Sequence, residues 1–283
     1  MLRCNTGAAT ALYLAATRGY SHADRVRPAM EALRVGYENG VVVLTGIGKP
    51  GQTGEVVARA ALAKGARLAV VSRSASEAEA RAAALRTDGA DVRGFPCDLS
   101  KEADVASLAG MVRDAFGEKV DALINMAGGF AMSGPVAESD FAAWQRQISI
   151  NLTTAYLATR AFLPALRAAR GSIVYFSSAS ALPGSRIARM SAYAASKSGV
   201  IALMRAVAQE ESQNGVRANA VAPTSIRTAA NLESMGSDAN YVERSEIAST
   251  VLWLCSEVAS AVTGVVVKLQ KADSRKQKAE NSS

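Results

Sequence analysis

Short apolar runs and amphipathic stretches alternate along the chain from residue 41 onwards. Apolar-rich segments occur at 41–44, 68–71, 92–96, 122–124, 172–176, 216–221 and 265–267, and the first of them is an unbroken apolar run. Runs of this length without polar alternation predict strands that are buried on both faces. The stretches between them predict helices over 54–64, 75–86, 101–116, 140–169, 191–212 and 243–257, the longest with a break near Pro164.

Strands that alternate with helices form right-handed βαβ units. We therefore expect an α/β protein: a single doubly wound Rossmann-fold domain, with a parallel sheet of about seven strands and helices on both faces. The domain is predicted over 40–269. Residues 1–39 are expected to form a poorly ordered extension, either a genuine segment or a mis-assigned start with Met30 as the alternative. Residues 270–283 are expected to form a polar, disordered tail.

Composition narrows the class of protein. The formal charge is +7, but five arginines against three acids lie in residues 1–40 and five cations against two acids lie in residues 268–283. Basic ends of this kind indicate solvated tails, so we expect no nucleic-acid partner. No apolar run reaches the length of a membrane span, so no membrane partner is expected. The three widely spaced cysteines favour a reducing, cytoplasmic location, and the single histidine, His22, excludes a Ser-His-Asp hydrolase and predicts no metal site.

A glycine-rich turn follows the first strand. Residues 45–54 read Thr-Gly-Ile-Gly-Lys-Pro-Gly-Gln-Thr-Gly, which places Gly46, Gly48, Gly51 and Gly54 between a strand and a helix. In this context the spacing Gly-x-Gly-x-x-Gly predicts dinucleotide binding, because the backbone can approach a pyrophosphate at a helix N-terminus.

The second strand ends where such folds meet the adenosine ribose. Ser72, Arg73 and Ser74 contain no acid that would bind the 2′-hydroxyl of NAD, and an arginine suits a 2′-phosphate. We therefore expect NADP(H) to be favoured over NAD(H).

Tyr193 and Lys197 form an acid–base pair. A lysine four residues after a tyrosine lies on the same helical face, and its charge favours the phenolate and lowers the tyrosine pKa towards neutrality.

These motifs and several others occur in the order typical of one family. Asn125-Met-Ala127-Gly128, Asn151, the Ser177-Ser178 strand end, the Tyr193/Lys197 pair, Cys97-Asp98-Leu99 and the Pro223–Thr228 segment all match. Over about residues 40–268 the chain resembles the short-chain dehydrogenase/reductase family, of the Tyr-x-x-x-Lys type. The resemblance implies an enzyme acting on a small-molecule carbonyl or alcohol, with 3-oxoacyl reductases as one example. It also implies a homo-oligomer, dimer or tetramer, formed through the long helices.

The resemblance also implies residue roles. Tyr193 would be the general acid and base, Ser178 would orient the substrate oxygen, and Asn151 would position a water that relays protons to Lys197. The residues expected to bind the cofactor are Gly46, Gly48, Gly51, Gly54, Ser72, Arg73, Ser74, Asp98, Leu99, Asn125, Ala127, Gly128, Tyr193, Lys197, Pro223, Ile226 and Thr228.

Some features depart from the family pattern. The glycine turn is two residues longer than usual, and the Ser178–Tyr193 separation is also longer, which leaves Ser180 as a rival to Ser178. The usual Val-Asp-Gly-Gly is absent after Val267. The long turn and the short segment after Thr228 keep two alternatives open: a dihydropteridine- or enoyl-reductase-like enzyme, and a non-catalytic NADP(H)-sensing protein.

Overall fold

A parallel sheet forms the centre of the protein. The computed structural model describes residues 37–86, 89–237 and 239–271. Within these residues the strands are β1 (Val41–Thr45), β2 (Arg67–Ser72), β3 (Val92–Pro96), β4 (Ala122–Asn125), β5 (Ser172–Phe176), β6 (Arg217–Pro223) and β7 (Val266–Leu269). They pair in the order β3-β2-β1-β4-β5-β6-β7, and every pairing is parallel. The predicted doubly wound sheet is confirmed, whereas the expectations for the extension before residue 37 and the tail after residue 271 lie outside the described residues.

Helices follow most of the strands. They are α3 (Thr53–Leu62), α4 (Ala75–Leu85), α5 (Glu102–Phe116), α6 (Phe141–Ile148), α7 (Thr154–Ala169), α8 (Ser191–Glu210), α9 (Ala229–Met235) and α10 (Arg244–Cys255). Short 3-10 turns occupy Val136–Glu138, Ala179–Ala181, Ser212–Asn214 and Glu257–Ala259, and one π-helical turn, η2, spans Ser149–Thr153.

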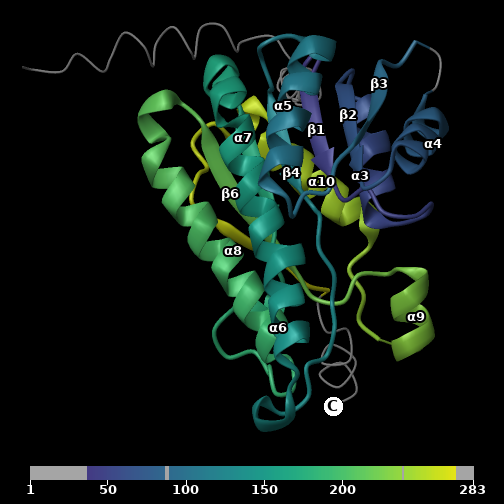
Figure 1. Cartoon of the computed structure of the whole chain (residues 1–283), viewed down its shortest axis with the longest axis vertical. Coiled ribbons are helices and arrows are strands. Elements are labelled where there is room, and N and C mark those ends of the chain that lie inside the picture. The colour runs from purple at the N-terminus through teal and green to yellow at the C-terminus, as the bar shows by residue number, and fades with distance from the viewer. Residues whose placement is uncertain (1–36, 87–88, 238, 272–283) are drawn as a thin grey trace, which may run out of the picture. The chain divides into compact units, whose positions relative to one another are not determined.

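Different helices pack on the two faces of the sheet. Val41 and Val43 of β1 belong to one buried cluster that also contains side chains of α5, α7 and α8. Val42 and Leu44 are equally buried and, because side chains alternate along a strand, they point to the opposite face. There α3 and α10 pack against each other (Figure 1). Burial on both faces explains why the central strands β1 and β4 read as largely apolar runs.

The helix predicted over 140–169 contains a break, but not at Pro164. Pro164 lies inside α7 without ending it, and the irregularity is the π-helical turn that separates α6 from α7. At this turn the Asn151 Nδ2 donates to the Gln147 carbonyl, 3.1 Å away. In a regular helix that carbonyl would accept from the backbone N–H of Asn151. The side chain therefore competes with the helix ladder, and the sequence pattern does not reveal this.

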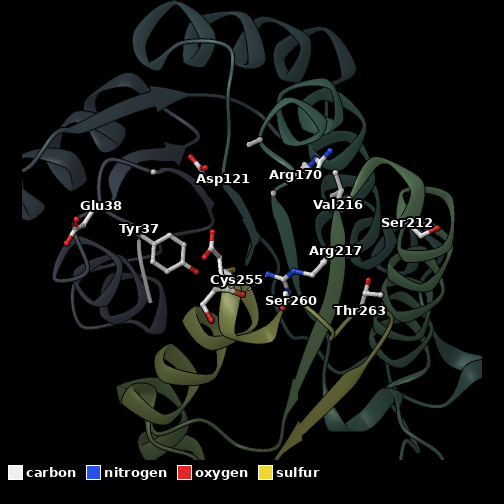
Figure 2. A pocket seen from close by; sticks show the side chains of 16 residues that line it. Tyr37, Glu38, Asp121, Arg170, Ser212, Val216, Arg217, Cys255, Ser260 and Thr263 are labelled. Carbon is white, nitrogen blue, oxygen red and sulfur yellow. Dashed lines mark hydrogen bonds between the residues drawn. The ribbon is translucent and has the colours of Figure 1, made fainter. Parts of the chain in front are cut away.

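The two edges of the sheet hold different cavities. At the amino edge, before the starts of β1, β4, β5 and β6, a cavity of about 410 Å³ is lined by residues that include Tyr37, Asp121, Arg217 and Cys255 (Figure 2). At the carboxyl edge lie the glycine turn, Asp98, Asn125 and Ser178, each at the end of a strand or within two residues of it. Parallel α/β sheets bind their ligands at the carboxyl edge, so the predicted site residues lie where the fold favours a site.

Candidate active site

Lys197 and Tyr193 lie one turn apart on α8 and line the same cavity, of about 860 Å³. The Lys197 side chain is only 5% exposed, its Nζ donates to the Phe176 carbonyl at 2.9 Å, and it lies 5.9 Å from the centre of the Tyr193 ring. Burial lowers the pKa of Lys197 to about 8. A lysine held in this way is a cation that gives up its proton far more readily than one in water.

The prediction that the Tyr193 pKa is lowered is wrong for this structure. Burial of the phenol raises the pKa of Tyr193, and a hydrogen bond with Ser178 acts in the opposite direction without overcoming it. The Lys197 ammonium is directed at the Phe176 carbonyl, and desolvation of the phenolate is the larger effect. At neutral pH the protein therefore carries Tyr193 as the protonated phenol.

Both candidate serines reach the cavity, but only Ser178 is coupled to the tyrosine. The Ser178 Oγ accepts from the backbone N–H of Ser180 at 3.2 Å and from the Ser180 Oγ at 2.9 Å. Ser178 is also the residue that hydrogen-bonds Tyr193. Ser180 thus holds the Ser178 hydroxyl in place, and this arrangement favours Ser178 as the group that meets a substrate oxygen.

Asn151 is buried behind the cavity wall instead of lining it. Its Oδ1 accepts from the Gly129 N–H and its Nδ2 donates to the Gly129 carbonyl, both at 3.0 Å. A Cβ on the neighbouring Gly128 would lie 2.4 Å from this Oδ1 and 3.2 Å from the Lys197 Nζ. The side chain of Asn151 therefore fixes the Gly128–Gly129 backbone against Lys197. Gln147 completes this network, because its Oε1 accepts a hydrogen bond from the Asn151 Nδ2 at 3.1 Å. No motif in the sequence had indicated a role for Gln147.

The glycine turn is fitted closely to the segment after β4. Gly46 has φ +70°, and a Cβ there would lie 2.5 Å from the Ala127 nitrogen. The Thr45 Oγ1 accepts from the N–H groups of Met126 at 3.2 Å and Ala127 at 3.4 Å. At the start of α3, a Cβ on Gly54 would lie 2.4 Å from the Ile47 carbonyl oxygen. Glycine is thus required at both positions by close backbone approach.

The four glycines do not contribute equally to the cavity. Gly46, Gly48 and Gly54 line it, whereas Gly51 does not. The Gly51 N–H donates to a Glu55 carboxylate oxygen at 2.7 Å, and its carbonyl accepts from the Arg244 guanidinium. Gly51 is therefore an exposed corner of the turn that is tied to α3 and α10.

A second cavity of about 490 Å³ continues from the first, with which it shares Gly46, Ile47, Gly48 and Gly128. Ser72, Arg73, Asp98, Leu99 and Ala127 line it as expected. The Asp98 carboxylate accepts from the hydroxyl and the N–H of Ser100, which hold the Asp98 pKa below its usual range. Glu77 and Arg146 also line this cavity. Neither residue was predicted from the sequence. Arg146 belongs to α6, which is distant in the chain from Ser72 and Arg73 of the same cavity.

Two other expected cofactor residues have structural roles outside these walls. The Ser74 Oγ caps α4 by accepting from the Glu77 N–H at 3.3 Å. The buried Asn125 Nδ2 donates to the Thr159 Oγ1 at 3.2 Å and so joins β4 to α7, while its Oδ1 has no partner in the described chain. Contact with a cofactor stays a prediction for these residues and equally for the expected residues that line the two cavities.

The far wall of the larger cavity comes from the segment after β6. Pro223, Ile226 and Thr228 line it, and Thr228 also caps α9 by accepting from the Asn231 N–H at 3.3 Å. Asn231 and Met235 of α9 complete this wall. The sequence predicted no helix here, because seven residues are too few to show helical periodicity.

The combined cavity suits a dinucleotide. Glycines without side chains leave room for a pyrophosphate before α3, and Ser72 and Arg73 line the smaller cavity beyond them. Within the described ranges no cluster of His, Cys, Asp and Glu could hold a metal ion. No helix of those ranges is both long and apolar enough to cross a membrane.

Comparison with known proteins identifies the family. The family described as short chain dehydrogenase matches residues 40–238. The chain is 34% identical over 244 residues to 2-(S)-hydroxypropyl-CoM dehydrogenase 3 of Xanthobacter autotrophicus, covering 80% of this chain and 93% of that protein. It is 33% identical over 223 residues to D-threitol dehydrogenase of Mycolicibacterium smegmatis, covering 75% of this chain and 84% of that protein.

Solved structures agree with this assignment. The crystal structure of levodione reductase superposes with a TM-score of 0.75 at 30% identity, covering 83% of this chain and 97% of that one. The crystal structure of gox2181 superposes with a TM-score of 0.77 at 28% identity, covering 83% and 96% of the two chains. The chain therefore belongs to the short chain dehydrogenase family and is an oxidoreductase that uses a nicotinamide cofactor.

Proposed function

We propose that this protein transfers hydride between NADP(H) and a carbonyl or alcohol substrate, with Tyr193 as the general acid and base. The observation that carries the proposal is the meeting of Tyr193, Lys197 and Ser178 in one cavity that continues into the glycine turn. An acid–base group, an orienting hydroxyl and a dinucleotide cradle in one continuous space are what carbonyl reduction requires.

Each residue has a defined task in the direction of reduction. The raised pKa keeps the proton on the Tyr193 hydroxyl, so the donor is loaded when a carbonyl oxygen arrives. The Ser178 hydroxyl donates to the same oxygen and orients it. The buried Lys197 ammonium would bind the nicotinamide ribose and stabilise the phenolate that remains after proton transfer. The bound cofactor would supply or accept the hydride.

The preference for NADP(H) rests on the residues at the adenosine end. Arg73 and Arg146 are the cations of the smaller cavity. The acids there are Glu77 and Asp98, and Asp98 is engaged by Ser100. A 2′-phosphate would pair with a guanidinium in this space. Arg73 is therefore the residue that we expect to distinguish NADPH from NADH.

The first test is a titration of NADPH and NADH into the purified protein, read by calorimetry. We expect tighter binding of NADPH and a loss of that preference in Arg73→Ala. Stronger NADH binding would refute the Arg73 argument but not the catalytic role of Tyr193. If neither cofactor bound, the proposed enzyme activity would be wrong.

The second test removes the phenol. Tyr193→Phe should bind NADPH like the wild type but lose about 10²- to 10⁴-fold in kcat with ketones, aldehydes and 3-oxoacyl thioesters. Tyr156→Phe is the matched control, because Tyr156 lies exposed on α7 away from the cavity. Equal turnover by wild type and Tyr193→Phe would contradict the assignment. Turnover of a quinonoid pterin or an enoyl thioester instead would favour the pteridine- or enoyl-reductase alternative, and cofactor binding without any turnover would favour the sensor.

The proposal also includes a homo-oligomeric assembly and a cytoplasmic location for the protein. We place homo-oligomer contacts on the long helices, where Phe141 at the start of α6 leaves a large apolar side chain exposed. Light scattering would distinguish a dimer from a tetramer, and a monomer at micromolar concentration would refute this part. Cys97 and Cys255 are free and buried, which fits a cytoplasmic protein.

A further inference from the structure

The larger cavity carries positive charge that the described chain does not neutralise. Among the described residues its charged lining side chains are lysines and one arginine, and no Asp or Glu lines it. Two cations just outside the cavity are paired: Arg227 lies 2.7 Å from Glu243, and Lys271 lies 2.6 Å from Glu246. Arg186 and Lys268, which line the cavity, are exposed and contact no carboxylate of the described chain.

The cofactor does not account for these two cations. Lys49 lies on the glycine turn, where it can meet the pyrophosphate. Arg186 instead belongs to the segment between Ser178 and Tyr193, which lines the same cavity as these two residues. Lys268 lies on β7 beside Ala222, so it stands next to the Pro223 segment. Arg186 and Lys268 therefore border the space left for a substrate.

Apolar side chains also contribute to the wall of that space. The Phe130 ring meets the Tyr193 ring edge-on, with centroids 5.0 Å apart, and Met190, Ile226 and Met235 line the same cavity. A substrate that fills it would present an apolar body to these side chains and a charged group to the rim. A guanidinium is well suited to bind a planar oxyanion at such a rim.

We propose that the natural substrate is an anionic oxo or hydroxy compound, and that Arg186, assisted by Lys268, binds its carboxylate or similar oxyanion. The inference rests on the proposed function, since it takes the carbonyl or alcohol carbon to lie at Tyr193. It adds the chemical class of the substrate and the residue that selects it.

The test compares matched acids and esters. Acetoacetate and levulinate differ in the distance from ketone to carboxylate, and their methyl esters keep the ketone but lose the charge. Each is titrated by calorimetry into protein saturated with oxidised cofactor, where no hydride is available and binding alone is read. The kcat/KM values for reduction are then measured with the reduced cofactor.

We expect at least one acid to bind about tenfold more tightly than its ester, because a charge-assisted hydrogen bond contributes on this scale. Arg186→Gln should remove most of that preference and leave ester binding unchanged. Lys268→Gln should remove a smaller part. Lys119→Gln is the matched control, because Lys119 is an exposed lysine before β4, outside both carboxyl-edge cavities.

Two results would overturn the inference. One is the absence of any preference for the acids, including binding of none of the four compounds. The other is an Arg186→Gln variant that weakens acids and esters equally, since that would indicate damage to the pocket. Failure of the proposed function looks different: acids would bind in an Arg186-dependent way, yet neither acids nor esters would be reduced.

Discussion

At the scale of single residues, Lys197 combines burial with a positive charge, and this makes protein stability depend on pH. The folded-state pKa of about 8 lies below the unfolded value of about 10.4, so between these values the unfolded chain binds more protons. Stability contributed by this group therefore rises with pH across that window. Relative to Lys197→Met, the wild type should gain about 3 kcal/mol between pH 7.5 and pH 10.5.

Urea unfolding of both proteins at several pH values measures this difference. Other buried groups, such as Tyr37 and Cys255, are common to both proteins and cancel in the comparison. Parallel stability profiles for the two proteins would show that Lys197 keeps an ordinary pKa despite its burial.

Gly54 shows how one missing side chain supports the cofactor cradle. A Cβ there would overlap the Ile47 carbonyl, so Gly54→Ala must push the start of α3 away from the turn. We expect weaker binding of the dinucleotide, by about tenfold or more, together with a lower melting temperature. In the control Gly110→Ala, on α5, the new Cβ meets nothing within 4 Å, and the better helix former should stabilise the protein. Equal cofactor affinity in both variants would contradict the role of Gly54.

At the scale of elements, the π-helical turn between α6 and α7 contains Asn151, whose side chain binds the Gly129 backbone. Asn151→Ala would remove both hydrogen bonds to Gly129 and leave that backbone unpaired beside Lys197. Gln147→Leu would remove one side-chain acceptor only. We therefore expect Asn151→Ala to cost about 2–4 kcal/mol of unfolding free energy and Gln147→Leu about 1 kcal/mol. Denaturant unfolding checks the order, and a larger loss in Gln147→Leu would show that the network is described wrongly.

The same elements show what could be read from the sequence. Most of the strands were predictable because short, mainly apolar segments are typical of a sheet covered on both faces. The π turn and α9 were not, since both depend on contacts made in the folded chain: Asn151 with Gln147 and Gly129, and the Tyr241 hydroxyl with the Asn231 and Gly236 carbonyls. In the site, spacing predicted the Tyr193–Lys197 pair, whereas the sign of the Tyr193 pKa shift depends on burial that only the fold creates.

At the scale of the whole molecule, the strands of the sheet lie between the candidate active site and a cavity with a structural role. The proposed catalytic groups lie at the carboxyl edge, and the amino edge contains the cavity around Arg217 (Figure 2). There the half-buried Arg217 guanidinium donates to the carbonyls of Leu254 at 2.6 Å and Ser256 at 2.9 Å, so it closes the end of α10 onto β6. Burial lowers the pKa of Arg217, because the guanidinium loses part of its hydration there.

Substitution at this edge should therefore change stability alone. Arg217→Met would leave these carbonyls unpaired, and we expect it to cost about 2–4 kcal/mol of unfolding free energy while kcat/KM stays at the wild-type value below the melting temperature. Arg170→Met is the matched control, because Arg170 lines the same cavity but is exposed. Denaturant unfolding and steady-state kinetics on the same preparations measure the two quantities. A loss of kcat/KM in Arg217→Met at full folding would mean that the two edges of the sheet are coupled, because the strands between them would then transmit the change.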